Sequence, residues 1–117
     1  MLSEIIEKIL IEKAKKKETI SYRELAEEIN RLSEKKIPTG RFLGVTLSRH
    51  LHKICEKYYR EGKGMLGSIV VNKKSGIPSD GFFRFAQELY SIDLKTDEEK
   101  RKFWQNEIKK VFRELKN

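Results

Sequence analysis

The stretch Ile20-Ser21-Tyr22-Arg23-Glu24-Leu25-Ala26 decides the fold, because it marks where a helix begins. The Ser21 side chain can accept a bond from an unpaired amide of the first turn, and Glu24, three residues later, can accept one from the amide of Ser21. Four apolar residues then recur at the spacing of one helix face, namely Leu25, Ala26, Ile29 and Leu32. The pattern predicts a helix over residues 22–32.

Helical spacing of apolar residues continues on both sides of this stretch. Residues 2–17 place isoleucine and leucine on one face and end in three lysines, which suit the negative end of a helix dipole. Residues 41–60 are expected to form a longer helix. Its apolar stripe consists of Leu43, Leu47, Leu51, Ile54, Cys55 and Tyr58. The first half of the chain is therefore predicted to be helical.

The β-structure is expected in the segment that follows. Met65 to Val71 is rich in β-branched residues, and residues 72–76 have the composition of a turn. Residues 77–82 are expected to return as an edge strand, since Pro78 lacks the backbone donor that an inner strand needs. These patterns together predict a small β-hairpin.

The remaining residues predict two more helices. A short one is expected over residues 83–90, and Thr96 and Glu99 form a second capping box ahead of a helix that runs to Leu115. The fold class is therefore mainly α with a small β-hairpin. The 117 residues are expected to form a single domain, with a core of residues 1–92 and an added C-terminal helix in residues 93–117.

Composition excludes several classes of protein. Cys55 is the only cysteine, so a disulfide within the chain and a cysteine-based zinc site are both excluded. No apolar run approaches the roughly 20 residues of a membrane span, and no secretory signal is evident at the start, so a cytoplasmic location is expected. Charged residues make up 38% of the chain, a composition typical of thermophile proteins.

Positive charge is concentrated in the middle of the chain. Residues 35–84 hold 11 basic and 3 acidic groups, which gives that segment the net charge of +8 that the whole chain carries. Within the expected helix over residues 41–60, four cations recur at a spacing of three or four and share one face. This cationic ridge consists of Arg49, Lys53, Lys57 and Arg60. It is either a surface for phosphate groups or an ordinary solvated helix face.

The order of elements resembles a winged helix-turn-helix, and short motifs resemble one version of it. Residues 20–26 resemble the start of the DNA-binding domain of O6-alkylguanine-DNA alkyltransferases and alkyltransferase-like proteins. Gly40-Arg41-Phe42-Leu43-Gly44 resembles the start of their recognition helix, and Ile69-Val70-Val71 resembles their segment after the reactive cysteine. Residues 70–82 also resemble a stretch found in a family of small proteins, which implies no activity. The resemblance covers about residues 19–82 and implies a winged-helix fold.

The resemblance also implies roles for two residues and removes the family's chemistry. By analogy Arg41 would enter the duplex in place of a flipped nucleotide, and Tyr22 would contact a backbone phosphate. Gly67 stands where the family has its alkyl-accepting cysteine, and Ser68 stands where it has the neighbouring histidine. Alkyl transfer is excluded, because both the nucleophile and its base are absent.

The sequence therefore favours a non-enzymatic protein that binds nucleic acid, and duplex DNA more than RNA. No catalytic residue, metal ligand or cofactor is expected, and a homodimer is compatible with the C-terminal aromatic residues. The expected nucleic-acid contacts are Tyr22, Arg41, Arg49, Lys53, Lys57, Arg60, Lys73 and Lys74.

Two other functions remain open from the sequence. One is a protein-interaction module that uses the C-terminal aromatic helix or the loop of residues 76–83. The other is a small metal-dependent nuclease, which would need His52, Glu56 and Asp80 to converge from different elements. Cys55 lies on the apolar stripe, so it is expected to be a buried, inert thiol.

Overall fold

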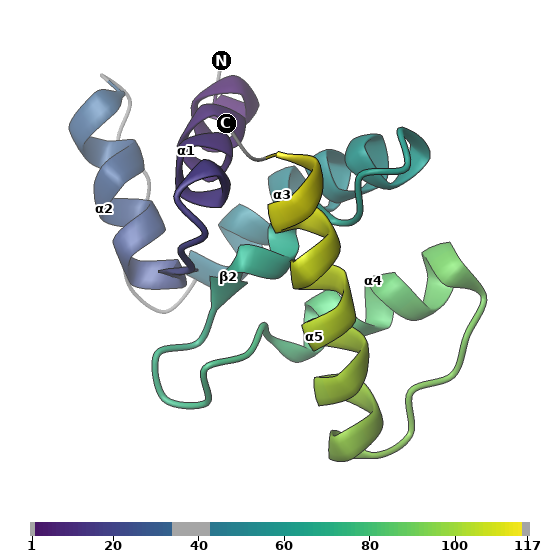
Figure 1. Ribbon diagram of the computed structural model, residues 1–117. Coiled ribbons are helices and arrows are strands. Elements are labelled where there is room, and N and C mark those ends of the chain that lie inside the picture. Colours follow the sequence, from purple (N-terminus) through teal and green to yellow (C-terminus); the bar gives the residue numbers. More distant parts are fainter. Residues whose placement is uncertain (1, 34–42, 116–117) are drawn as a thin grey trace.

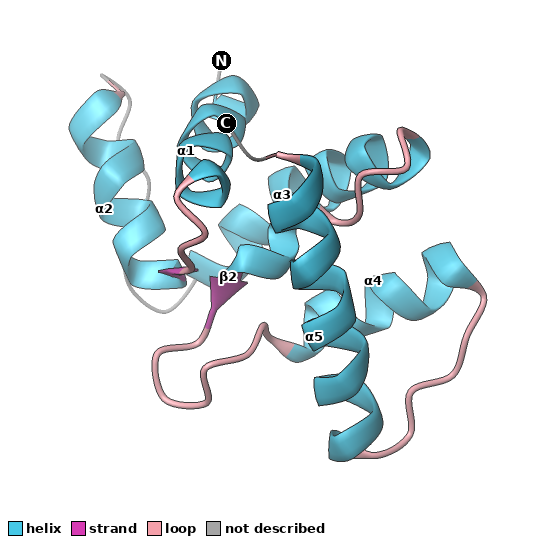
Figure 2. Cartoon of the chain, in the orientation of Figure 1, coloured by secondary structure: helices cyan, strands magenta, loops and turns pink. Residues whose placement is uncertain are grey.

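The computed structural model describes residues 2–33 and 43–115 and, within them, is mainly helical (Figures 1 and 2). The elements are α1 (Leu2–Lys15), β1 (Ile20–Ser21), α2 (Tyr22–Leu32), α3 (Leu43–Arg60), the 3-10 helix η1 (Leu66–Ile69), β2 (Val70–Val71), α4 (Asp80–Tyr90) and α5 (Asp97–Glu114). Within these ranges no helix combines the length and apolar character needed to cross a bilayer. Arg41 lies outside the described residues.

The capping box at the start of α2 is confirmed. The Ser21 hydroxyl accepts a hydrogen bond from the Glu24 amide at 3.1 Å, and the Glu24 carboxylate accepts one from the Ser21 amide at 3.0 Å. Thr96 and Glu99 form the same pair of bonds at the start of α5. Both helices begin where the sequence predicts, because each box satisfies donors that the helix itself leaves unpaired.

The predicted β-hairpin is wrong. The two strands pair in parallel, with Ile20 opposite Val70 and Ser21 opposite Val71. The paired strands are therefore about fifty positions apart in the chain, whereas a hairpin pairs strands that are adjacent in sequence. The apolar run before β2 forms η1, whose four residues are all buried. The run is mostly apolar because α1, α3 and α5 pack around it, and this burial favours the same residue types as strand pairing.

A loop of residues 72–79 replaces the expected return strand. The Asn72 amide donates to the Ile77 carbonyl at 2.9 Å, and the Gly76 amide donates to the Asn72 carbonyl at 2.8 Å. Gly76 has a φ of +76°, which the missing side chain permits. Ser79 then serves as the N-cap position of α4, so the chain enters a helix before a second strand can form.

The core has two parts that meet around η1. The larger part packs α1, α2, α3 and η1 together, and α5 adds Ile108 and Val111 to it. The smaller part lies between α3 and α4 and contains Cys55, Met65 and Phe83. The segment that connects α3 to β2 is therefore enclosed by apolar side chains, and its backbone position is tightly set.

We expect Ser21→Ala to lower the free energy of unfolding by about 1 kcal/mol, because the first turn of α2 loses its side-chain acceptor. Urea unfolding followed by circular dichroism measures the change. Thr19→Ala, two residues earlier on the exposed link, is the control and should shift stability by less than about 0.5 kcal/mol. Equal stability of the two variants would contradict the role of the capping box.

Candidate nucleic-acid interface and its pocket

All four members of the cationic ridge are exposed, but two of them have acidic partners. The Lys57 ammonium lies 2.9 Å from a Glu7 carboxylate oxygen, and Arg60 lies 2.7 Å from Glu56. Glu7 also accepts a 2.6 Å hydrogen bond from the Tyr58 hydroxyl, which ties α1 to α3. Lys57 and Arg60 are thus partly neutralised.

The other half of the ridge consists of Arg49 and Lys53, both exposed. Among the described residues, neither has a carboxylate within ion-pair distance. Burial lowers the pKa of His50, and the positive charges of Lys53 and Arg49 lower the pKa of this imidazole further. The spacing of Glu56 and Arg60 allows the second pair to be expected from sequence, but the first could not be, because Glu7, the partner of Lys57, comes from a different helix.

Lys73 and Lys74 are exposed on the loop of residues 72–79, and no carboxylate in the described part of the chain pairs with either. The pKa of Glu24 is lowered mainly by its hydrogen bonds with Ser21, and the charge of Lys73 lowers that pKa further. The loop therefore brings a cation close to the start of α2.

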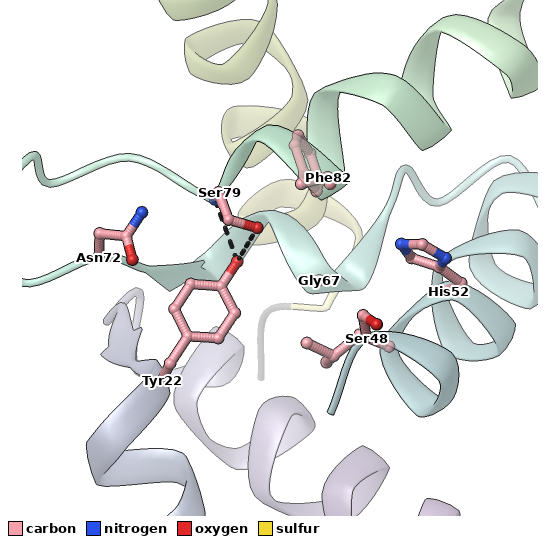
Figure 3. Close-up of a pocket in the computed structure, with 9 residues that line it drawn as sticks. Tyr22, Ser48, His52, Gly67, Asn72, Ser79 and Phe82 are labelled. Carbon is pink, nitrogen blue, oxygen red and sulfur yellow. Dashed lines mark hydrogen bonds between the residues drawn. The ribbon is translucent and has the colours of Figure 1, made fainter. Parts of the chain in front are cut away.

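A pocket of about 190 Å³ lies where the start of α2, α3, η1, the loop and the start of α4 meet (Figure 3). Its lining residues are Tyr22, Ser48, Leu51, His52, Gly67, Asn72, Ser79, Gly81 and Phe82. Among the described residues, the side chains that line it are aromatic, aliphatic, hydroxyl, amide and imidazole groups, with no carboxylate or ammonium. Such a lining suits an uncharged ring that offers a few hydrogen-bonding atoms.

Tyr22, expected to contact phosphate, lines this pocket, and its hydroxyl already has two hydrogen bonds there. The hydroxyl donates to the Ser79 side chain at 3.1 Å and accepts from the Ser79 amide at 3.1 Å (Figure 3). These bonds join the start of α2 to the start of α4. Tyr22 therefore builds the pocket wall.

His52 lies on the α3 side of the pocket, and its ring is stacked on Phe85 with centroids 4.2 Å apart. Burial lowers the pKa of His52, although the nearby Glu88 charge and a hydrogen bond to the Gly81 backbone act in the opposite direction. Glu56 pairs with Arg60 on the same helix. No three histidine, cysteine or acidic side chains in the described ranges are arranged to hold a metal ion.

Gly67 forms the pocket wall at a place where a side chain would not fit. A Cβ atom at this position would lie 2.6 Å from the Cys55 sulfur. Cys55 itself is fully enclosed, and burial raises the pKa of its thiol to about 12. Position 67 thus lacks a nucleophile, and the thiol behind it is inert, as the sequence predicted.

Sequence reasoning missed the pocket as a unit. Tyr22 and Gly67 came from the resemblance, and His52 came from its spacing to Glu56. Asn72 and Ser79 lie in the stretch of residues 70–82 that resembles a family of small proteins, but nothing in that stretch or around Ser48 indicated a shared pocket. The useful signal was compositional, since Gly76, Pro78 and Gly81 lie close together in an otherwise helical chain.

Comparison with known proteins adds no assignment: no family model, no curated protein and no solved structure matches the chain.

We expect Gly67→Ala to destabilise the protein by about 1–3 kcal/mol, because the new methyl group overlaps the Cys55 sulfur in a close-packed core. In a Cys55→Ala background the same change should cost at least about 1 kcal/mol less, since the obstructing sulfur is gone. A double-mutant cycle measured by urea unfolding tests this coupling. Strict additivity would show that the two positions do not compete for space.

Proposed function

We propose that this chain is a winged-helix-like nucleic-acid-binding protein that contacts duplex DNA without chemically altering it. The supporting observation is that cations without an ion-pair partner among the described residues come directly after pocket-lining residues in the chain. Three pocket-lining residues are each followed directly by an exposed cation: Ser48 by Arg49, His52 by Lys53, and Asn72 by Lys73. Exposed cations are therefore the next residues in the chain after pocket-lining residues on two different elements, which suits a ligand whose neutral ring is attached to phosphates.

In this proposal α2 and α3 are the helices of the helix-turn-helix, and the loop of residues 72–79 serves as the wing. Arg49 and Lys53 on α3 and Lys73 and Lys74 on the loop contact backbone phosphates. Lys57 and Arg60, which already have carboxylate partners, contribute less. Arg41 remains a proposed duplex contact from the resemblance.

The pocket is proposed to receive one unstacked base of the bound nucleic acid. Its volume of about 190 Å³ exceeds the roughly 150 Å³ of a protein cavity that holds benzene. Tyr22 and Phe82 offer aromatic surface, and Asn72 and His52 offer hydrogen-bonding atoms. Gly67 brings no nucleophile to the base, so the proposed activity is binding alone.

The metal-dependent nuclease finds less support. It needs His52, Glu56 and Asp80 to converge, yet Glu56 is paired with Arg60 and the His52 ring is stacked on Phe85. A module that binds another protein has no specific surface in its favour among the described residues.

We expect Arg49→Glu/Lys53→Glu to weaken duplex DNA binding more than about tenfold at low salt, because two phosphate contacts are replaced by repulsion. The plot of log binding constant against log salt concentration should become shallower by about 2. Fluorescence anisotropy of a labelled duplex measures both quantities.

The matched control for this test is Lys8→Glu/Lys15→Glu, which makes the same change in net charge on the exposed side of α1. When both double variants are compared at physiological salt, the control should weaken binding by less than about threefold, since long-range charge is screened there. Equal losses of DNA affinity in the two double variants would contradict the proposed interface. Undetectable binding of duplex DNA by the wild-type chain at low salt would also contradict it.

We expect the wild-type chain to bind a duplex with one unpaired base more tightly than the fully paired duplex, because unstacking that base costs less. Gly81→Leu should remove this preference by filling the pocket, while leaving the affinity for paired duplex unchanged. A side chain is tolerated at position 81, where a Cβ atom has no contact closer than the Ser79 hydroxyl at 3.7 Å. Gly81→Ala is the small control and should keep the preference; a preference that survives Gly81→Leu would contradict the pocket's role.

A further inference from the structure

The C-terminal helix α5 lies beside the segment that carries η1 (Figure 1). It contacts this segment at three adjacent points. The Trp104 indole nitrogen donates a 2.8 Å hydrogen bond to the Ser68 carbonyl. The Glu107 side chain, only 4% exposed, accepts a 2.8 Å bond from the Met65 amide. Gly64 lies so close to α5 that a Cβ atom there would meet Lys110 at 3.2 Å and Val111 at 3.3 Å.

The opposite side of η1 faces α3 and the pocket. Gly67 presses against Cys55 of α3 and forms part of the pocket lining. The chain then continues into β2, which pairs with β1, and β1 leads directly into Tyr22. The loop with Lys73 and Lys74 begins one residue after β2. A displacement of η1 would therefore move the pocket wall, the start of α2 and the loop that carries Lys73 and Lys74.

We propose that Trp104 and Glu107 are positioning residues for the pocket: they hold the two ends of the Met65–Ser68 segment, so that Gly67 and the basic loop stay in the geometry that binds the ligand. This inference rests on the proposed function. Neither residue lines the pocket, so neither contacts a ligand bound there. Glu107 also accepts a hydrogen bond from the Tyr90 hydroxyl at the end of α4. Glu107 therefore also links α5 to α4, the helix whose first residues line the pocket.

The first test compares the wild-type chain with Trp104→Phe, which keeps an aromatic ring and removes the indole N–H, and with Glu107→Gln. Asn106→Ala, on the exposed side of the same helix, is the matched control. We expect Trp104→Phe to reduce the preference for the unpaired-base duplex by about threefold to tenfold, the worth of one hydrogen bond. The affinity for paired duplex should fall by less than this, because Arg49 and Lys53 on α3 are proposed to contact phosphates independently of the loop. An unchanged preference in both Trp104→Phe and Glu107→Gln would overturn the proposal.

Amide hydrogen exchange provides a second readout that needs no ligand. In Trp104→Phe we expect faster exchange at residues 65–72, while α2 exchanges as it does in the wild type and in Asn106→Ala. Uniformly faster exchange, including α2, would show a merely structural role and overturn the proposal. A wild-type chain with no preference for an unpaired base would refute the proposed pocket function, and the exchange pattern alone would then decide whether α5 positions η1.

Discussion

The parallel pairing of β1 with β2 is the contact on which the candidate site depends. It is only two residues long on each strand, yet it joins the start of α2 to the end of η1. Tyr22 follows the first strand and Asn72 follows the second, so one short ladder brings both residues to the same pocket. The Tyr22–Ser79 hydrogen bonds then draw the start of α4 to this junction and close it.

The local features of this fold could be predicted from sequence, and the non-local ones could not. Ser21 with Glu24 and Thr96 with Glu99 determine helix starts through bonds within four residues, so their positions are encoded directly in the chain. The pairing of Ile20 with Val70 depends on how α1, α3 and η1 pack, and a β-branched run gives no information about which partner it has. The hairpin was therefore a reasonable interpretation of residues 65–82 and a wrong one.

The candidate site shows the same division. Helical spacing correctly places Arg49, Lys53, Lys57 and Arg60 among the exposed residues of α3. It cannot reveal that Glu7 of α1 reaches Lys57, because that ion pair is set by helix packing. Similarly, Gly67 looks in the sequence like a missing cysteine, whereas the structure places the Cys55 sulfur where a side chain would begin.

The closeness of Gly67 and Cys55 also constrains the order in which substitutions can accumulate. A cysteine introduced at position 67 would collide with the existing sulfur before it could act as a nucleophile. The replacement of Cys55 by a smaller residue must therefore come first, although by itself it brings no chemical gain and leaves a cavity. A single substitution therefore cannot convert this pocket into an alkyl acceptor, because Cys55, Gly67 and Ser68, which stands where the resembled enzymes have a histidine, would all have to change.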